Sequence, residues 1–224
     1  MSYGFEVHSR PRKVGQDVVE KFRDVAVAHA SDSMSRLSHG GATLRPFHGG
    51  GGLAGPALTV RTRPGDNLMV HKALNMAEPG DVIVVDAGGD LTNAIIGELM
   101  LAYAVHQKVA GIVIYGAVRD IAAIRANTLP VYASGITHRG PYKDGPGEVN
   151  CAISIEGMVI MPGDLIIGDS DGLLGIPFDA VDTVYAGVLA SRQREAKVLA
   201  ETRNGTIDRN WVDAALRARD CLGL

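Results

Sequence analysis

GIVIYGAVRD, residues 111–120, opens as one of the most apolar stretches of the chain and ends on an arginine and an aspartate. Its first eight residues predict a buried strand, because β-branched and other apolar side chains dominate them. A protein core does not hold unpaired charges, so Arg119 and Asp120 should lie where that strand ends. Local chemistry leaves two interpretations. The pair is part of a binding site, or Asp120 caps the following helix and Arg119 lies on the surface.

The segments on both sides of this stretch predict the type of sheet. VIVVDA (82–87) is a continuous apolar run, typical of a strand covered on both faces, and PVYASG (130–135) predicts a third strand. Between the three strands, AIIGELMLAYAVHQ (94–107) and IAAIRAN (121–127) predict helices. Two consecutive strand–helix–strand units predict a parallel sheet segment with right-handed crossovers.

The remaining segments predict helices and a second kind of β structure. Apolar periodicity predicts helices over 16–38 and 66–77, the latter with Asp66 at its N-cap, and alternation predicts a strand over 57–64. After residue 145, short apolar runs separated by Gly and Pro predict antiparallel strands. Helices are expected again over 179–203 and 208–219.

Composition and charge exclude several classes of function. With 46% hydrophobic and 21% charged residues, the 224-residue chain has the composition of a globular protein with a sizeable core. A net charge of −3 leaves no basic excess for binding nucleic acid. No apolar run is long enough for a signal peptide or a membrane span, so we expect a cytoplasmic protein. Cys151 and Cys221 are too few for a disulfide framework.

Several familiar motifs are incomplete. GGGLAG satisfies GxGxxG at Gly50, Gly52 and Gly55, but Pro56 and a strand pattern follow where a dinucleotide site needs a helix. VIVVDAGGD lacks the full glycine spacing of nucleotide-cofactor methyltransferases. The sequence has no GxSxG for a serine hydrolase and no HExxH among its seven histidines. Schiff-base chemistry requires a desolvated lysine. The lysines of this chain lie in polar or loop-like contexts, namely Lys13, Lys21, Lys72, Lys108, Lys143 and Lys197.

The polar residues at the strand ends remain as the candidate site. In open α/β sheets, ligands bind beyond the carboxyl ends of the strands. GGD (88–90) follows one strand, GELM (97–100) lies on or just before the next helix, and Arg119 and Asp120 end the following strand. Arginine offers a planar fork that matches a carboxylate. Aspartate offers the hard oxygen that Mg²⁺ or Mn²⁺ takes from a protein while keeping most of its waters.

The order of these motifs resembles a known family. GELM, then YGAVRD, then PVYASG, and later PGDLIIGDSDGLLGIP resemble the 4-hydroxy-4-methyl-2-oxoglutarate/4-carboxy-4-hydroxy-2-oxoadipate aldolases, whose fold the regulator of ribonuclease activity A (RraA) proteins share. The resemblance implies an α/β fold, an α-β-β-α sandwich of the swivelling phosphohistidine-domain type with a C-terminal helical extension. It also implies homotrimers or homohexamers with active sites at subunit contacts. We therefore expect one RraA-like aldolase domain over 1–205 and a C-terminal helical tail over 206–224.

The same resemblance implies a role for each matching residue. Arg119 would bind the pyruvyl group of the substrate and act in catalysis. Asp120 would be the catalytic ligand of a divalent metal cation, Mg²⁺ or Mn²⁺, in an otherwise aqueous shell. Four backbone amides would hold the pyruvyl moiety, those of Gly97, Glu98, Leu99 and Met100. Glu98 stands where the family often has aspartate.

A C-terminal helix of these aldolases supplies a glutamate to the neighbouring subunit's site. Glu195 matches that residue best by position and Glu201 is close to it, while an ordinary surface glutamate is the alternative. The long C-terminal part itself is a feature of the aldolases and is missing from the shorter ribonuclease regulators.

As a function, the resemblance implies a class II pyruvate aldolase. It would cleave 4-hydroxy-4-methyl-2-oxoglutarate or 4-carboxy-4-hydroxy-2-oxoadipate through a pyruvate enolate, with oxaloacetate decarboxylase activity on the side. Its partner would be a small 2-oxo-4-hydroxy acid, with no nucleic acid and no membrane. The alternative is a non-catalytic, protein-binding regulator of ribonuclease activity that keeps the Arg–Asp pair idle.

Overall fold

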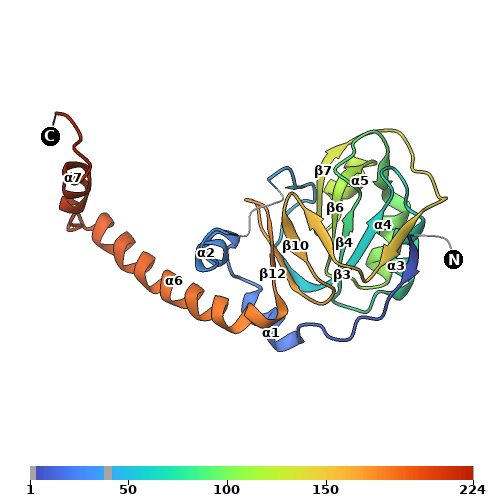
Figure 1. Cartoon of the computed structure of the whole chain (residues 1–224), viewed down its shortest axis with the longest axis horizontal. Helices are drawn as coiled ribbons and strands as arrows, with labels where there is room; N and C mark the ends of the chain where they lie inside the picture. The colour runs from blue at the N-terminus through green and yellow to red at the C-terminus, as the bar shows by residue number, and fades with distance from the viewer. Residues whose placement is uncertain (1–3, 38–41, 224) are drawn as a thin grey trace.

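A mixed sheet forms the centre of the computed structural model, which describes residues 4–37 and 42–223. Ten strands within these residues belong to this sheet: β1 (Phe5–Val7), β2 (Arg45–Pro46), β3 (Leu53–Thr62), β4 (Val82–Asp86), β5 (Ala94–Ile96), β6 (Gly111–Val118), β7 (Val131–Ile136), β8 (Gly147–Val149), β11 (Leu165–Gly168) and β12 (Leu173–Ile176). The main path through the sheet runs β1-β8-β3-β4-β6-β7-β2 (Figure 1). β5 pairs with β6 beside this path, and β11 pairs with both β3 and β12.

Helices and a small second sheet cover the two faces of this sheet. One core cluster joins the sheet to α3 (Leu68–Met76), α4 (Glu98–His106) and α5 (Ile121–Ala126). The other joins it to α1 (Gln16–Phe22), α2 (Val27–Ser33), α6 (Val181–Arg203) and the hairpin of β9 (Ile153–Ile155) and β10 (Met158–Ile160). A short 3₁₀ helix, Phe178–Ala180, precedes α6, and α7 (Asn210–Arg217) follows it.

The four central strands β3, β4, β6 and β7 are parallel, which confirms the predicted strand–helix–strand units. β4 shows why its sequence has no polar alternation. Val82 and Val84 belong to one core cluster, and Ile83 and Val85 to the other. Both faces of the strand are therefore dry, as in other parallel sheets.

The helix predicted over 16–38 is wrong as one element, because the chain breaks between α1 and α2. Ala26 is extended, with ψ of 133°, and the preceding Val25 is buried. The carboxylate of Asp169, far along the chain, accepts a hydrogen bond from the amide of Val27 at 2.9 Å. A tertiary contact thus starts the second helix at a point that local periodicity does not mark. Residue 38, the last of the predicted helix, lies outside the described residues.

The helix predicted over 94–107 is also wrong in its first part. Ala94–Ile96 forms β5, which lies parallel to the end of β6, and the helix starts only at Glu98. The strand predicted over 57–64 begins earlier, at Leu53, since residues 53–56 pair with β11. Asp66 lies one position before the N-cap of α3, yet its carboxylate accepts a hydrogen bond from the amide of Leu68 at 2.9 Å.

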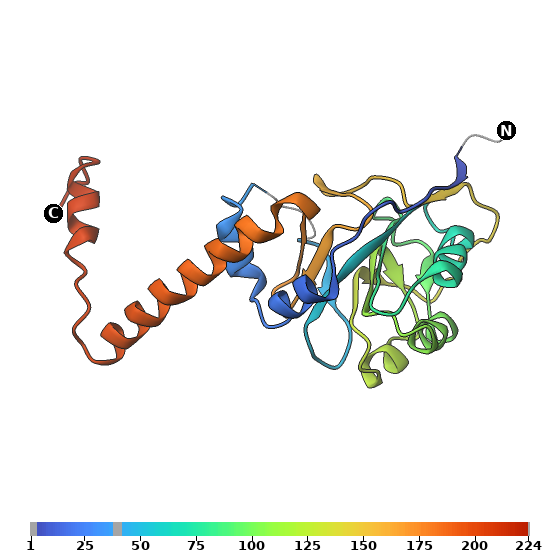
Figure 2. The same cartoon turned by 90° about the horizontal axis from the view of Figure 1, so that it is seen from below.

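The part of the chain after residue 145 contains the predicted antiparallel strands. β9 pairs with β10, and β11 pairs with β12 and β3, all antiparallel. The predicted C-terminal helices correspond to α6 and α7, and Figures 1 and 2 show α6 leading away from the sheet to α7 at its far end. The phosphohistidine-domain type of sandwich and the domain boundary at residue 205 stay predictions. In the described residues, no helix combines the length and apolar character that crossing a membrane requires.

The N-terminal segment runs along the body of the protein before α1 (Figure 2). Its Arg10 guanidinium binds the carboxylate of Asp81 through two hydrogen bonds of 2.9 and 2.8 Å. The Asp81 side chain is fully buried and also accepts the amide of Glu78 at 2.9 Å. A buried carboxylate is stable only when it is paired and hydrogen-bonded in this way.

Candidate active site

The pairing of β5 with β6 brings together the two motifs that the sequence singles out. β5 ends at Ile96 beside Val118, the last residue of β6, so Gly97 and Arg119 follow neighbouring strand ends. The amide of Arg119 donates to the carbonyl of Ile96 at 3.0 Å and closes this contact. The parallel pairing therefore explains how GELM meets the Arg–Asp pair across the intervening helix.

The Asp120 carboxylate binds the start of α4 and does not cap α5. The residue occupies the N-cap position, but its side chain makes no capping hydrogen bond. Its backbone is left-handed, with φ of 57° and ψ of 44°, a conformation that aspartate tolerates better than most residues. The carboxylate Oδ2 instead accepts a hydrogen bond from the amide of Glu98 at 2.9 Å. The helix-cap interpretation of the side chain is therefore wrong.

Gly97 is required for this close approach. A Cβ atom at residue 97 would lie 2.3 Å from Asp120 Oδ2, 2.9 Å from Arg119 Cγ and 3.0 Å from Arg119 Nε. A side chain at these distances would push the Arg119 and Asp120 side chains out of place, so glycine allows the backbone of GELM to lie against both charged residues.

Arg119 is held beside Asp120 and faces a pocket. Its Nε lies 3.6 Å from Asp120 Oδ2, and its side chain is 39% exposed. A Cβ at Gly140 would come within 3.0 Å of Arg119 Nη1, so the loop that contains Gly140 packs closely against the guanidinium. The planar group keeps donors available for a ligand that enters the pocket.

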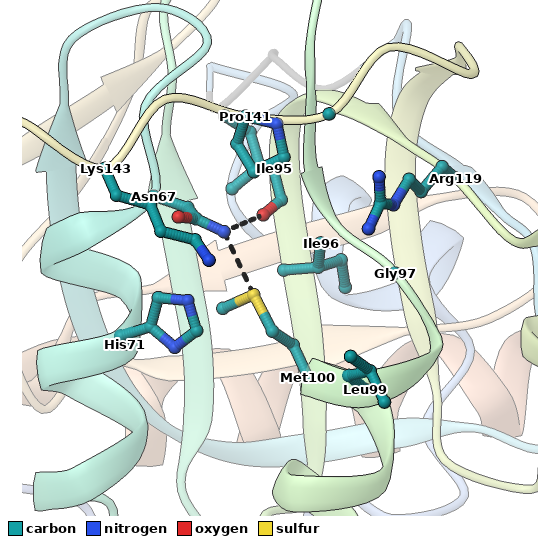
Figure 3. A pocket seen from close by; sticks show the side chains of 11 residues that line it. Asn67, His71, Ile95, Ile96, Gly97, Leu99, Met100, Arg119, Pro141 and Lys143 are labelled. Atoms are coloured by element: carbon teal, nitrogen blue, oxygen red, sulfur yellow. Dashed lines mark hydrogen bonds between the residues drawn. The ribbon is translucent and has the colours of Figure 1, made fainter.

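The pocket has a volume of about 280 Å³ and lies between α3, α4 and the loop of residues 139–145. Figure 3 shows Arg119 on one side of it and His71, Asn67 and Lys143 on the other, with Met100 between the two sides. The lining consists of Asn67, His71, Ile95, Ile96, Gly97, Leu99, Met100, Arg119, Gly140, Pro141 and Lys143. Both ends of the pocket thus carry basic side chains.

The side of the pocket opposite Arg119 has one fixed charge. Burial lowers the pKa of His71, and the nearby Lys143 ammonium lowers it further, so the imidazole is neutral at pH 7. Lys143 then supplies the positive charge. Asn67 is buried on the same side as Lys143, and its amide nitrogen donates to the Ile95 carbonyl at 2.9 Å and to Met100 Sδ at 3.1 Å.

The donors at Asp120 fit a hydrated divalent cation. The Asp120 side chain is 42% exposed, and its Oδ1 takes part in no hydrogen bond among the described residues. In the described part of the chain, the surroundings of Asp120 included, no group of three or more His, Cys, Asp and Glu residues could hold a metal ion, so Asp120 would be a lone protein ligand. A single carboxylate open to water suits Mg²⁺ or Mn²⁺, which keep several water ligands in protein sites.

A family model described as RraA-like, Aldolase/RraA, matches residues 27–174 of the chain. A protein of Halalkalibacterium halodurans, provisionally named 4-hydroxy-4-methyl-2-oxoglutarate aldolase, is 43% identical over 72% of this chain and 77% of its own length. The chain belongs to the RraA-like family. A Thermus thermophilus protein named 4-hydroxy-4-methyl-2-oxoglutarate aldolase is 34% identical to this RraA-like chain, over 60% of this chain and 81% of its own length.

A solved structure from Streptomyces coelicolor has the same fold as this RraA-like chain. It is described as an unusual member of the RNase ES inhibitor RraA protein family and superposes with a TM-score of 0.75. The match covers 83% of this chain and 96% of that one at 24% identity, which supports the fold alone. The α/β fold with its large mixed sheet therefore agrees with known RraA-like structures.

The structure brings most of the predicted site residues together. Gly97, Leu99, Met100 and Arg119 line the pocket, while Glu98 and Asp120 adjoin it through their mutual hydrogen bond. Sequence reasoning missed Asn67 and His71 and set Lys143 aside as a loop residue. The spacing of four between Asn67 and His71 places both on one face of a helix, but only the fold shows which face meets the pocket.

The two candidate glutamates lie on α6. Glu195 Oε2 is 2.7 Å from Nε2 of His29 on α2, and Glu201 Oε1 is 3.8 Å from Nζ of Lys197. Both contacts lie within one chain: the first is a hydrogen bond to an imidazole, and the second is a surface ion pair. A role for either glutamate in a neighbouring subunit stays a prediction.

Proposed function

We propose that this RraA-like chain is a divalent-cation-dependent class II aldolase that releases pyruvate from 4-hydroxy-4-methyl-2-oxoglutarate or 4-carboxy-4-hydroxy-2-oxoadipate. Oxaloacetate decarboxylation is its side reaction. One observation carries the proposal, namely the contact of Gly97 with Arg119 and Asp120 at the edge of a pocket with basic side chains at both ends. The relatives named as aldolases support the same reaction class.

The chain's own groups bind and orient the pyruvyl part of the substrate. Arg119 donates to its carboxylate and ketone oxygens from a planar fork. The first-turn amides of α4 lie beside this position, because a helix leaves its first amides without internal partners. Asp120 occupies the amide of Glu98, so the amides of Gly97, Leu99 and Met100 are the ones left for the ligand.

Bond cleavage requires stabilisation of negative charge next to Arg119. Water in the pocket takes the proton of the C4 hydroxyl, and C4 becomes the carbonyl carbon of the second product as the C3–C4 bond breaks. The electron pair of that bond remains on C3 as the enolate of pyruvate. Arg119 stabilises the charge that develops on the enolate oxygen, and water returns a proton to C3. A cation held by Asp120 would supply Lewis-acid polarisation of the ketone. Oxaloacetate passes through the same enolate when it loses carbon dioxide.

The opposite end of the pocket accounts for the second carboxylate of these substrates. Lys143 and His71 line the side across from Arg119, and only Lys143 is charged at pH 7 because the pKa of His71 is lowered. A 2-oxo-4-hydroxy diacid therefore meets one cation at each end. This arrangement favours a diacid over a substrate that lacks the second carboxylate.

The decisive experiment measures pyruvate release by the purified full-length protein from a panel of 2-oxo-4-hydroxy acids and from oxaloacetate. We expect release with Mg²⁺ or Mn²⁺, its loss after addition of a chelator, and its return when the metal is restored. Absence of pyruvate from every substrate at saturating metal would refute the aldolase and favour a protein-binding regulator of ribonuclease activity.

Replacing Lys143 by methionine should raise KM for a diacid substrate about tenfold, because the aliphatic stem remains and the charge is lost. kcat should stay within about twofold, as should kcat/KM for a substrate with a C4 methyl group and no second carboxylate. Lys72→Met, on the exposed side of α3, is the matched control. A KM unchanged from that of the parent protein would remove Lys143 from substrate binding.

We also propose a homotrimer or homohexamer as the working assembly, which light scattering would test. The exposed position of Leu99 supports it: the side chain is 84% exposed at the pocket, where a large apolar group gains from being covered.

A further inference from the structure

Asp66 is a buried carboxylate close to the pocket that has no place in the reaction described so far. Its side chain is fully buried between the end of β3 and the start of α3. Oδ1 accepts the amide of Leu68 at 2.9 Å, and Oδ2 accepts the amides of Asp144 at 2.7 Å and Gly145 at 2.9 Å. Arg63 Nη2 lies 3.2 Å from Oδ2 and balances its charge.

Hydrogen bonds to the start of α3 hold the residues immediately before and after Lys143 in the sequence. The amide of Tyr142 donates to the carbonyl of Gly65 at 2.8 Å, and the amide of Asn67 donates to the carbonyl of Tyr142 at 3.0 Å. The two residues after Lys143 are held by the Asp66 carboxylate. The backbone that carries Lys143 is thus fixed to the start of α3, the helix that carries His71.

The other end of the same loop is fixed beside Arg119. The amide of Ala94 donates to the carbonyl of Arg139 at 2.8 Å, and Asn93 Nδ2 donates to the carbonyl of Gly140 at 2.5 Å. Gly140 in turn packs against the Arg119 guanidinium. Residues 139–145 therefore span the pocket from its Arg119 side to its His71 side, with one anchor at each end.

We infer that Asp66 is a positioning residue that fixes Lys143 relative to Arg119 and so selects diacids whose two carboxylates fit that separation. This inference rests on the proposed function, since it assigns Lys143 to the second carboxylate. Asp66 acts through Lys143 and does not touch the substrate.

A carboxylate suits this position better than an amide would. Three backbone N–H groups and a guanidinium converge on Asp66, and both of its oxygens accept. Asparagine presents one accepting oxygen and one NH₂ group. Its NH₂ group must therefore face either the amide of Leu68 or the amides of Asp144 and Gly145, which are themselves donors. Asp66→Asn thus releases one side of the anchor while changing the side-chain volume little.

In the test, Asp66→Asn should raise KM for a diacid substrate about tenfold and leave kcat within about twofold. kcat/KM for the substrate without a second carboxylate should not change. Combining Asp66→Asn with Lys143→Met should add nothing to the KM of Lys143→Met alone, since both remove the same contact. An unchanged KM, or an equal loss on both substrates, would overturn the inference.

Asp81→Asn is the matched control. Asp81 is also fully buried and also binds an arginine and a backbone amide, but it lies just before β4 and its arginine is on the N-terminal segment, away from the pocket. It should lower the melting temperature without changing the ratio of kcat/KM between the two substrates. A shift of that ratio by Asp81→Asn equal to the shift by Asp66→Asn would mean that general loosening explains the effect.

Amide hydrogen exchange tests the anchor independently of activity and of the folding of any variant. In the wild-type protein, the amides of Asp144 and Gly145 should be protected although they lie in a loop, and Asp66→Asn should speed their exchange about tenfold or more. Fast exchange of both amides in the wild type would overturn the inference. If the wild type releases no pyruvate, the proposed function fails, while the exchange data still decide whether Asp66 holds this loop.

Discussion

Arg119→Lys is expected to lower kcat/KM for a diacid substrate by roughly two to three powers of ten, or about 2.7–4 kcal/mol of transition-state stabilisation. Lysine keeps the positive charge but loses the planar fork that donates to two oxygens at once. The substitution also removes Nε, which in the parent protein lies 3.6 Å from Asp120 Oδ2. A point charge on a flexible stem cannot reproduce this geometry beside the developing enolate.

The control for this variant is Arg125→Lys. Arg125 is an exposed residue on α5, and its replacement should leave kinetics at the parent value and stability within about 0.5 kcal/mol. Mn²⁺ affinity of Arg119→Lys should barely change, because Asp120 remains. If Arg119→Lys folds, binds Mn²⁺ and cleaves substrate at the parent rate, the guanidinium has a structural role and the aldolase proposal fails with it.

Asp120→Asn is expected to remove most of the activity, with a fall in pyruvate release of about a hundredfold or more at limiting Mg²⁺. The fold should survive, for two reasons. Asparagine is tolerated in the left-handed conformation that residue 120 adopts, with φ of 57°. Its side-chain oxygen can also keep the hydrogen bond from the Glu98 amide. What is lost is the negative charge that would hold a hard cation.

A titration of activity against Mg²⁺, together with the melting temperature, measures this effect. Asp208→Asn is the control, because Asp208 likewise accepts a backbone amide, that of Asn210 at 2.8 Å, at an exposed position ahead of α7. Parent-level turnover of Asp120→Asn at low metal would mean that Asp120 is not a metal ligand.

The central strands and the charged end of β6 could be predicted from the sequence, because they depend on local composition. β4 and β6 are apolar runs bounded by turn residues, and a charge pair cannot continue a dry strand. Length and spacing then place both strand ends at one edge of a parallel sheet. The prediction of where ligands bind rests on this general geometry and not on any one side chain.

β5 and the direction of the Asp120 side chain could not be predicted in this way. The apolar residues of AIIGELM satisfy a helix and a strand equally well, and only the pairing of β5 with β6 decides between them. Asp120 stands where helix-capping rules expect a capping aspartate. Its carboxylate instead accepts a hydrogen bond from the backbone amide of Glu98, 22 positions earlier. His71 enters the site through the packing of α3, which local sequence does not encode.

The buried pair of Arg10 and Asp81 shows that the packed core extends beyond the segment that the family model matches. The family match begins at residue 27 and ends at residue 174. A fragment trimmed to those limits would leave a fully buried carboxylate without its arginine, and it would strip Phe22 and Val188 from the core. Expression boundaries for this protein should therefore follow its hydrogen bonds and buried side chains, which extend well beyond the aligned segment at both ends.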